Sequence, residues 1–266
     1  MKRARSRLVA GALSLAVVGS ATGGVIAAQA DDPAPRAQAA QQGGVSISPA
    51  TVETTAKRGS VGRFTVKNTT RGTLRVTVTV RPWNQNRSTA IVALNRRANL
   101  SPYVVGSPAS FDLKPGSRSV KLNMKRTTAS GSLYGGIQIF AKQKRKKATN
   151  GIIPQYEVVG RLRLNPSRKR PNLRVGATDV VGTGNNRSLI LAVRNVGNTL
   201  DPVGGTVRIT GPTARTATIP QAGVVPGQVV YLKGGSLRGM KRGNYTAEWT
   251  VTQGPKRFVV KRGFSL

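Results

Sequence analysis

The residues best suited to chemistry in this sequence are clustered positive charges. The densest cluster lies within residues 142–147, and a second one occupies residues 168–170. Ammonium and guanidinium groups bind phosphate and carboxylate groups, so several of them on one loop can surround an anionic polymer. We therefore take eight side chains as candidate anion-binding residues: Lys142, Lys144, Arg145, Lys146, Lys147, Arg168, Lys169 and Arg170.

Both clusters also have a structural explanation. The first cluster directly follows an expected strand at 137–140 and opens a loop that runs to Gln155. Such a loop is either an anion-binding finger or a solvated connection whose charges discourage edge-to-edge aggregation. The second cluster lies between two prolines and is explained more simply as a charged linker.

The residue types that most enzymes need are missing. The 266 residues include no His and no Cys, and the eight Asp and Glu residues are scattered along the chain. These absences exclude Ser-His-Asp and Cys-His nucleophile systems, thiol redox chemistry and an ordinary zinc site. We name no catalytic residue, and we expect a protein that is not an enzyme and has no cofactor or metal. An enzyme assembled from distant carboxylates is the least favoured reading.

The first 30 residues match a secretory signal peptide. Four basic residues precede an apolar run at 8–18, and Ala28-Gln29-Ala30 fits the small-residue cleavage rule. We expect export, cleavage after Ala30 and no transmembrane segment in the mature chain. A retained membrane anchor is the alternative, because residues 8–30 could just span a bilayer.

The remainder of the chain predicts an all-β protein with two Ig-like sandwiches in tandem. Apolar residues alternate with polar ones at period two, and Gly and Pro punctuate the runs. No stretch shows a helical period. We expect a flexible leader at 31–44, a first sandwich at 45–165, a basic linker at 166–171 and a second sandwich at 172–266.

The two predicted sandwiches share local patterns. Phe64-Thr-Val-Lys-Asn68 parallels Leu191-Ala-Val-Arg-Asn195, and Pro115-Gly116 parallels Pro226-Gly227. In each unit a tyrosine, Tyr134 or Tyr245, follows the glycine by 18 residues. Both tyrosines open a strand after a glycine turn, as a tyrosine corner does in Greek-key sandwiches. The equal spacing favours a duplicated design.

The charge balance indicates a polyanionic partner. There are 43 Lys and Arg residues against 8 Asp and Glu residues, a net charge of +35. Self-repulsion on this scale costs stability unless a counterpart carries the opposite charge. Nucleic acid is disfavoured, because an exported protein leaves the cytoplasm and its basic residues are not interleaved with stacking aromatics. Anionic wall polymer or peptidoglycan fits better.

Several motifs resemble a known family. They are Val45-Ser-Ile-Ser-Pro49, Phe64-Thr-Val-Lys-Asn68, the stretch at 108–116, the strand at 120–124 and Tyr134-Gly-Gly-Ile137. Over residues 45–164 they resemble exported WxL-interacting, peptidoglycan-binding domain proteins, which are related in fold to pilus chaperones. The resemblance implies a secreted or wall-associated Gram-positive surface protein that binds wall polymer or another surface protein.

Two functions follow as hypotheses. The first is a cell-envelope protein without enzymatic activity that binds anionic wall polymer, peptidoglycan or a surface protein. The alternative is a chaperone or assembly factor for surface fibres that donates an edge strand to a subunit. Its donor would be the last strand of the first sandwich, at 156–164, although the same alternation also suits a strand packed within its own sheet.

Overall fold

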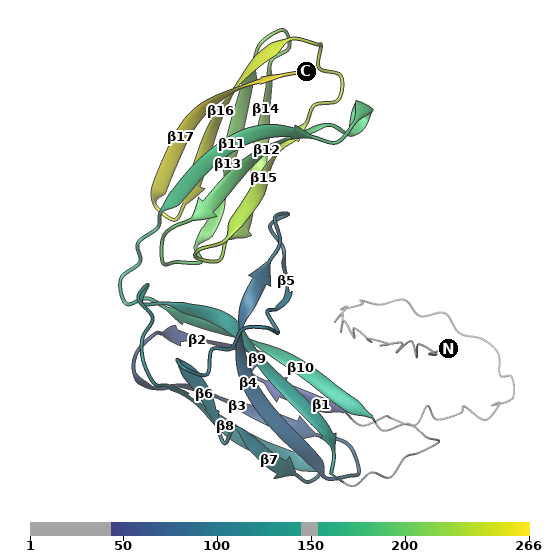
Figure 1. Ribbon diagram of the computed structural model, residues 1–266, viewed down its shortest axis with the longest axis vertical. Helices are drawn as coiled ribbons and strands as arrows, with labels where there is room; N and C mark the ends of the chain where they lie inside the picture. Colours follow the sequence, from purple (N-terminus) through teal and green to yellow (C-terminus); the bar gives the residue numbers. More distant parts are fainter. Residues whose placement is uncertain (1–43, 145–153) are drawn as a thin grey trace, which may run out of the picture. The chain divides into compact units, whose positions relative to one another are not determined.

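The structure is a computed structural model that describes residues 44–144 and 154–266. Within these residues the protein consists of β-strands, and the one helical turn is the 3₁₀ segment η1 (Gly184–Asn186). The all-β class and the tandem sandwiches are thereby confirmed (Figure 1). No helix in the described part of the chain is long and apolar enough to cross a membrane. The signal peptide with Ala30, and the candidates Arg145, Lys146 and Lys147, lie outside the described residues.

The first sandwich is formed by two sheets. One sheet has the order β1-β3-β8-β6, and the other has the order β2-β10-β9-β4-β5 with β7 also pairing with β4. The strands are β1 (Val45–Ser48), β2 (Thr51–Thr55), β3 (Gly59–Asn68), β4 (Leu74–Gln85), β5 (Ile91–Leu94), β6 (Val104–Ser107), β7 (Ser110–Leu113), β8 (Gly116–Met124), β9 (Leu133–Gln143) and β10 (Gln155–Asn165).

The second sandwich also has two sheets, of order β11-β12-β15 and β14-β13-β16-β17. Each sandwich buries its own apolar cluster, and the large buried side chains include Phe64 in the first and Trp249 in the second. The strands are β11 (Leu173–Val181), β12 (Ser188–Asn195), β13 (Pro202–Thr210), β14 (Arg215–Gly223), β15 (Val229–Ser236), β16 (Asn244–Gln253) and β17 (Lys256–Ser265).

A buried asparagine ends the equivalent strand of each sandwich, β3 in the first and β12 in the second. Asn68 Nδ2 donates to the carbonyl oxygens of Gly72 and Leu113, at 2.9 and 3.0 Å. Asn195 Nδ2 donates to the carbonyl oxygens of Thr199 and Val224, at 2.8 and 2.7 Å. Each amide therefore ties the turn that follows its own strand to the segment just before a Pro-Gly turn. The parallel seen in the sequence reflects this repeated hydrogen-bond pattern.

The two tyrosines of the repeated pattern differ in their bonding. Tyr245 Oη donates to the Lys241 carbonyl, 2.7 Å away, and so forms the predicted corner. Tyr134 Oη instead donates to Asn165 Oδ1 at 3.1 Å, at the end of β10. The expectation of a corner at Tyr134 is wrong, because its hydroxyl reaches a side chain near the end of the sandwich rather than the turn before its own strand.

The hairpin between β4 and β5 makes polar contacts with residues of the second sandwich. The Gln85 amide donates from Nε2 to the Gly223 carbonyl at 2.7 Å and accepts at Oε1 from the Val225 N–H at 2.8 Å. Gln85 is buried, and Arg87 accepts a hydrogen bond at its carbonyl from the Tyr231 N–H. Because a buried amide is costly when unpaired, Gln85 requires both partners.

Candidate functional site

The first half of β10 has one unpaired edge among the described residues. Along its whole length β10 pairs with β9, but β2 pairs with it only from Arg161 to Asn165. The Arg161 N–H donates to the Ala50 carbonyl on the β2 side, at 2.7 Å. Alternate residues of a strand direct their backbone groups to the same side, so the N–H and C=O groups of Glu157 and Val159 lie on this open edge. Figure 1 shows β10 beside β9.

The side chains of β10 separate into two sets. Leu162 and Leu164 are fully buried, and Tyr156 and Val158 are half-buried against the same core. On the opposite face Val159 is 42% exposed. Because the inward residues near the open edge are only partly covered, an added strand would find apolar side chains beside its backbone partners.

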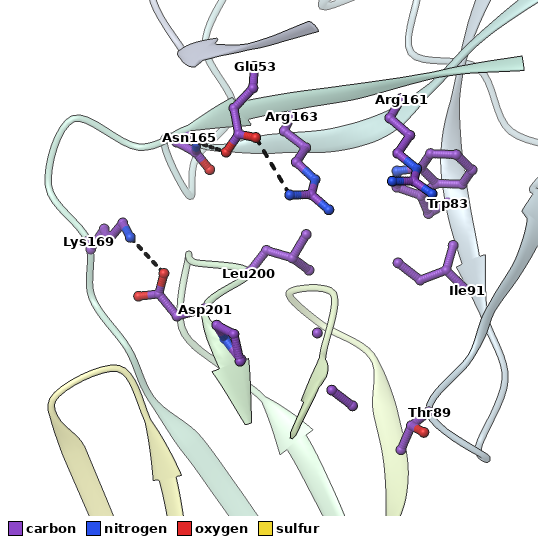
Figure 2. Close-up of a pocket in the computed structure, with 13 residues that line it drawn as sticks. Glu53, Trp83, Thr89, Ile91, Arg161, Arg163, Asn165, Lys169, Leu200 and Asp201 are labelled. Carbon is purple, nitrogen blue, oxygen red and sulfur yellow. Dashed lines mark hydrogen bonds and ion pairs between the residues drawn. The ribbon is translucent and has the colours of Figure 1, made fainter. Parts of the chain in front are cut away.

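A pocket of about 660 Å³ adjoins the end of this edge (Figure 2). Three consecutive outward positions of β10 line it, namely Arg161, Arg163 and Asn165. The remaining lining residues come from several other segments and are both apolar and charged: Glu53, Trp83, Thr89, Ile91, Lys169, Leu200, Asp201, Pro202, Ala222 and Gly223.

The charges in the pocket are paired with one exception. Arg163 lies 3.5 Å from Glu53, whose other oxygen accepts from Asn165 Nδ2 at 2.9 Å. Lys169 lies 2.6 Å from Asp201. Figure 2 draws these interactions as dashed lines. Among the described residues no ion pair or side-chain hydrogen bond involves Arg161, so its guanidinium is available to an anionic ligand.

The first basic cluster does not begin a loop at Lys142, as the sequence suggested. β9 continues to Gln143, and Lys142 is paired with Arg75 on one side and Gln155 on the other. Lys144 follows the strand and contacts Asp112 through its ammonium group. The strand is longer because β4 and β10 both extend along it and supply ladder partners beyond Phe140. The role of the cluster in anion binding stays a prediction.

The second basic cluster follows β10 and is fixed at several points. Asn198 Oδ1 accepts from the Arg170 N–H at 2.7 Å, and Asn198 Nδ2 donates to the Arg168 carbonyl at 3.1 Å. Lys169 is held by Asp201, whereas the side chains of Arg168 and Arg170 are exposed. These contacts fit the structural explanation of a connecting segment, and anion binding by its side chains also stays a prediction.

Two side chains have shifted pKa values. The hydrogen bond from Lys144 lowers the pKa of the Asp112 carboxyl, with Arg75 adding to the effect against the opposing effect of burial. Burial raises the pKa of the Tyr134 hydroxyl. Both shifts are explained by packing within the fold. The described residues contain no group of three or more Asp and Glu side chains placed to hold a metal ion.

No family model and no curated protein matches the chain. Among solved structures the YadV chaperone is similar, at 12% identity and a TM-score of 0.42, over 84% of this chain and 99% of that one. The class 5 fimbriae chaperone CfaA has 11% identity and a TM-score of 0.46, over 82% and 98% of the two chains. The E. coli chaperone DraB has 12% identity and a TM-score of 0.39, over 83% of this chain and 99% of that one.

These similarities concern the fold alone. No family model supports the WxL-interacting family that the sequence suggested. Sequence reasoning identified β10 as a strand but missed two of its features, the open edge at Glu157 and Val159 and the unpaired Arg161. The alternation at 156–164 was the signal for the first of them, and no local signal marked the second.

Proposed function

We propose that the chain is an exported assembly factor that pairs an extended segment of a surface protein with β10. The open edge at Glu157 and Val159 is the observation that carries this proposal. Two backbone donors and two acceptors lie there, next to the half-buried Tyr156 and Val158. Backbone hydrogen bonds would supply affinity, and the alternate side chains would supply selectivity.

Arg161 extends the same site. Its guanidinium lies in the pocket two residues beyond Val159, and no described acid neutralises it. A carboxylate of the bound segment would form a charge-assisted hydrogen bond with it, which is stronger than a neutral one. The site thus combines an edge that accepts any extended backbone with one charge that selects an acidic group.

Replacing Val159 by proline tests the edge. Proline removes the N–H at position 159, which faces away from β9, so the β9–β10 ladder keeps its hydrogen bonds. With a photo-crosslinking residue at the exposed Gln155 in producing cells, we expect one exported protein to be captured through an extended segment. V159P should reduce the yield of this adduct at least tenfold.

The control is V159T, which keeps the N–H and the strand preference of a β-branched side chain. It should crosslink as the unmodified chain does. Circular dichroism must show that V159P retains its β-sheet content. An equal adduct yield in a folded V159P protein would contradict strand pairing at this edge.

A second candidate function, binding of an anionic wall polymer or peptidoglycan, is supported by the unbalanced charge. The described residues hold six acidic side chains. Five of these acids form all the ion pairs found among the described residues. Most basic side chains therefore have no acidic partner in the described part of the chain. A polymer that neutralises many of them would release counterions and bind more weakly as salt rises.

Replacing the first basic cluster tests this candidate. We expect the mature protein to bind purified cell walls. Because binding would release counterions, the affinity should fall at least about tenfold between roughly 50 and 200 mM salt. Gln at Lys142, Lys144, Arg145, Lys146 and Lys147 should weaken binding and flatten this salt dependence. An affinity that does not change with salt would contradict electrostatic binding.

A further inference from the structure

The acids of the first sandwich are all engaged with cations around one of its two sheets. Asp112 in β7 contacts Arg75 at 3.3 Å and also Lys144. Glu157 in β10 contacts Arg96 at 2.9 Å. Glu53 in β2 contacts Arg163 at 3.5 Å. The positive charge of the sheet that contains β2, β10, β9, β4 and β7 is therefore partly neutralised within the molecule.

The outer face of the other sheet, β1-β3-β8-β6, has a different composition. The inward residues of its two central strands, such as Phe64 and Val120, are buried. The outward positions of these strands carry cations and hydroxyl groups: Arg63, Thr65, Lys67, Ser117, Ser119 and Lys121. The three cations are exposed, and none of the ion pairs among the described residues includes them.

The strand register places two of these cations directly opposite each other. Arg63 of β3 faces Lys121 of β8, Thr65 faces Ser119, and Lys67 faces Ser117. Like charges at directly opposed positions destabilise a sheet. The Arg63–Lys121 pair lies at one end of the face, and Lys67 lies at the other end, about 13 Å away along the strand. The hydroxyl groups of Thr65, Ser117 and Ser119 lie next to these cations.

We propose that this face binds a linear polymer that bears phosphate groups. Phosphate oxygens accept hydrogen bonds from ammonium, guanidinium and hydroxyl groups alike, and these are the donors that the face presents. A polymer lying along β3 and β8 would place charge at both ends of the face at once. The six named side chains include no aromatic ring on which a nucleic-acid base could stack.

The proposal rests on the second candidate function and adds to it a surface outside both basic clusters. Binding would also remove the repulsion between Arg63 and Lys121. The unbound face is therefore destabilised, and a phosphate polymer should raise the thermal stability of the first sandwich.

The test measures binding of the mature chain to two phosphate polymers, inorganic polyphosphate and purified wall teichoic acid. Binding to polygalacturonate, whose charges are carboxylates, is measured for comparison. The variant R63Q/K67Q/K121Q removes three charges from the proposed face. The control R75Q/R96Q/K261Q removes three charges that are each paired with an acid, at Asp112, Glu157 and Glu248. Both variants have the same net charge.

We expect the face variant to bind polyphosphate and teichoic acid at least tenfold more weakly, and the control variant to bind within threefold of the unmodified chain. The magnitude of the slope of log affinity against log salt should be smaller by about 2 to 3 in the face variant, because three fewer phosphate contacts form and fewer counterions are released on binding. Without polymer, the face variant should melt no lower than the unmodified chain, and polyphosphate should no longer raise its melting temperature.

Equal losses in the two variants would overturn the proposal, because net charge alone would then determine binding. Tighter binding of polygalacturonate than of both phosphate polymers would overturn the assignment to phosphate. If the unmodified chain binds none of the three polymers, the second candidate function itself fails. Strand pairing at β10 is unaffected by that result, because its crosslinking experiment involves no polymer.

Discussion

Replacing Asn195 by alanine is expected to lower the free energy of unfolding of the second sandwich by about 4 kcal/mol, since each buried polar group left unpaired costs about 1–3 kcal/mol. Asn195 is fully buried. Its amide satisfies the carbonyls of Thr199 and Val224, and its Oδ1 accepts from the Gly197 N–H at 2.9 Å. Alanine would leave the Val224 carbonyl unpaired and the Thr199 carbonyl with only the long contact to Gln253 Nε2 at 3.5 Å, whereas the Gly197 N–H would keep its bond to the Asn172 carbonyl at 3.0 Å. Urea denaturation followed by hydrogen exchange of peptides from each sandwich would measure the loss.

The control for this change is Asn123→Ala. Asn123 lies in β8, is half-buried, and its side chain forms no hydrogen bond with the other described residues. We expect it to change stability by less than about 0.5 kcal/mol. Asn68→Ala should destabilise the first sandwich by an amount similar to that of N195A. If N195A proves as mild as the Asn123 control, the asparagine does not hold the two turns together.

Truncating Trp249 to alanine should have an effect of the same size on the second sandwich, about 4 kcal/mol, because a large buried ring leaves a cavity. Trp249 in β16 is fully buried, and its ring lies against Gly234 of β15. A Cβ atom at Gly234 would come within 2.4 Å of the ring. The glycine is thus required by the close approach of the indole, and hydrogen exchange of β12 and β13 peptides would report the loss of protection.

The same contact can be tested from the glycine side. Gly234→Ala alone should destabilise the sandwich by about 2 kcal/mol through overpacking. Combined with Trp249→Phe, which gives the new methyl more room, it should cost less than the sum of the two single changes. Strict additivity would contradict the packing described. Phe140→Ala, at a side chain 37% exposed, is the control for loss of an aromatic ring and should cost under about 1 kcal/mol.

Much of the fold could be predicted from the sequence, because local spacing determines which face a strand residue occupies. The alternation around Phe64, Val120 and Leu162 corresponds to buried positions. The matching Asn and Pro-Gly patterns identified a repeated hydrogen-bond arrangement before any partner was known. Strand ends were less predictable, as Lys142 shows, because they depend on partners distant in the sequence.

The candidate site was less accessible to sequence reasoning because it depends on pairing between distant segments. That β2 stops pairing with β10 at Arg161 follows from the strand register and not from either strand's composition. Asp112 lies in β7 and meets Lys144 from a segment 32 residues away, a contact that the residues around Asp112 do not indicate. The alternation predicts that Arg63 points outward, but it does not predict that Arg63 lies directly opposite Lys121 in the neighbouring strand.

The uneven neutralisation of the two sheets has a consequence for how the first sandwich meets a charged boundary. Near an anionic layer, the face of Arg63, Lys67 and Lys121 would be attracted along its whole length. The open margin of β10 belongs to the other sheet, where Arg161 is the pocket cation without an acidic partner among the described residues. A polymer held on the β3–β8 face would therefore leave this margin, with Arg161, free for an arriving protein.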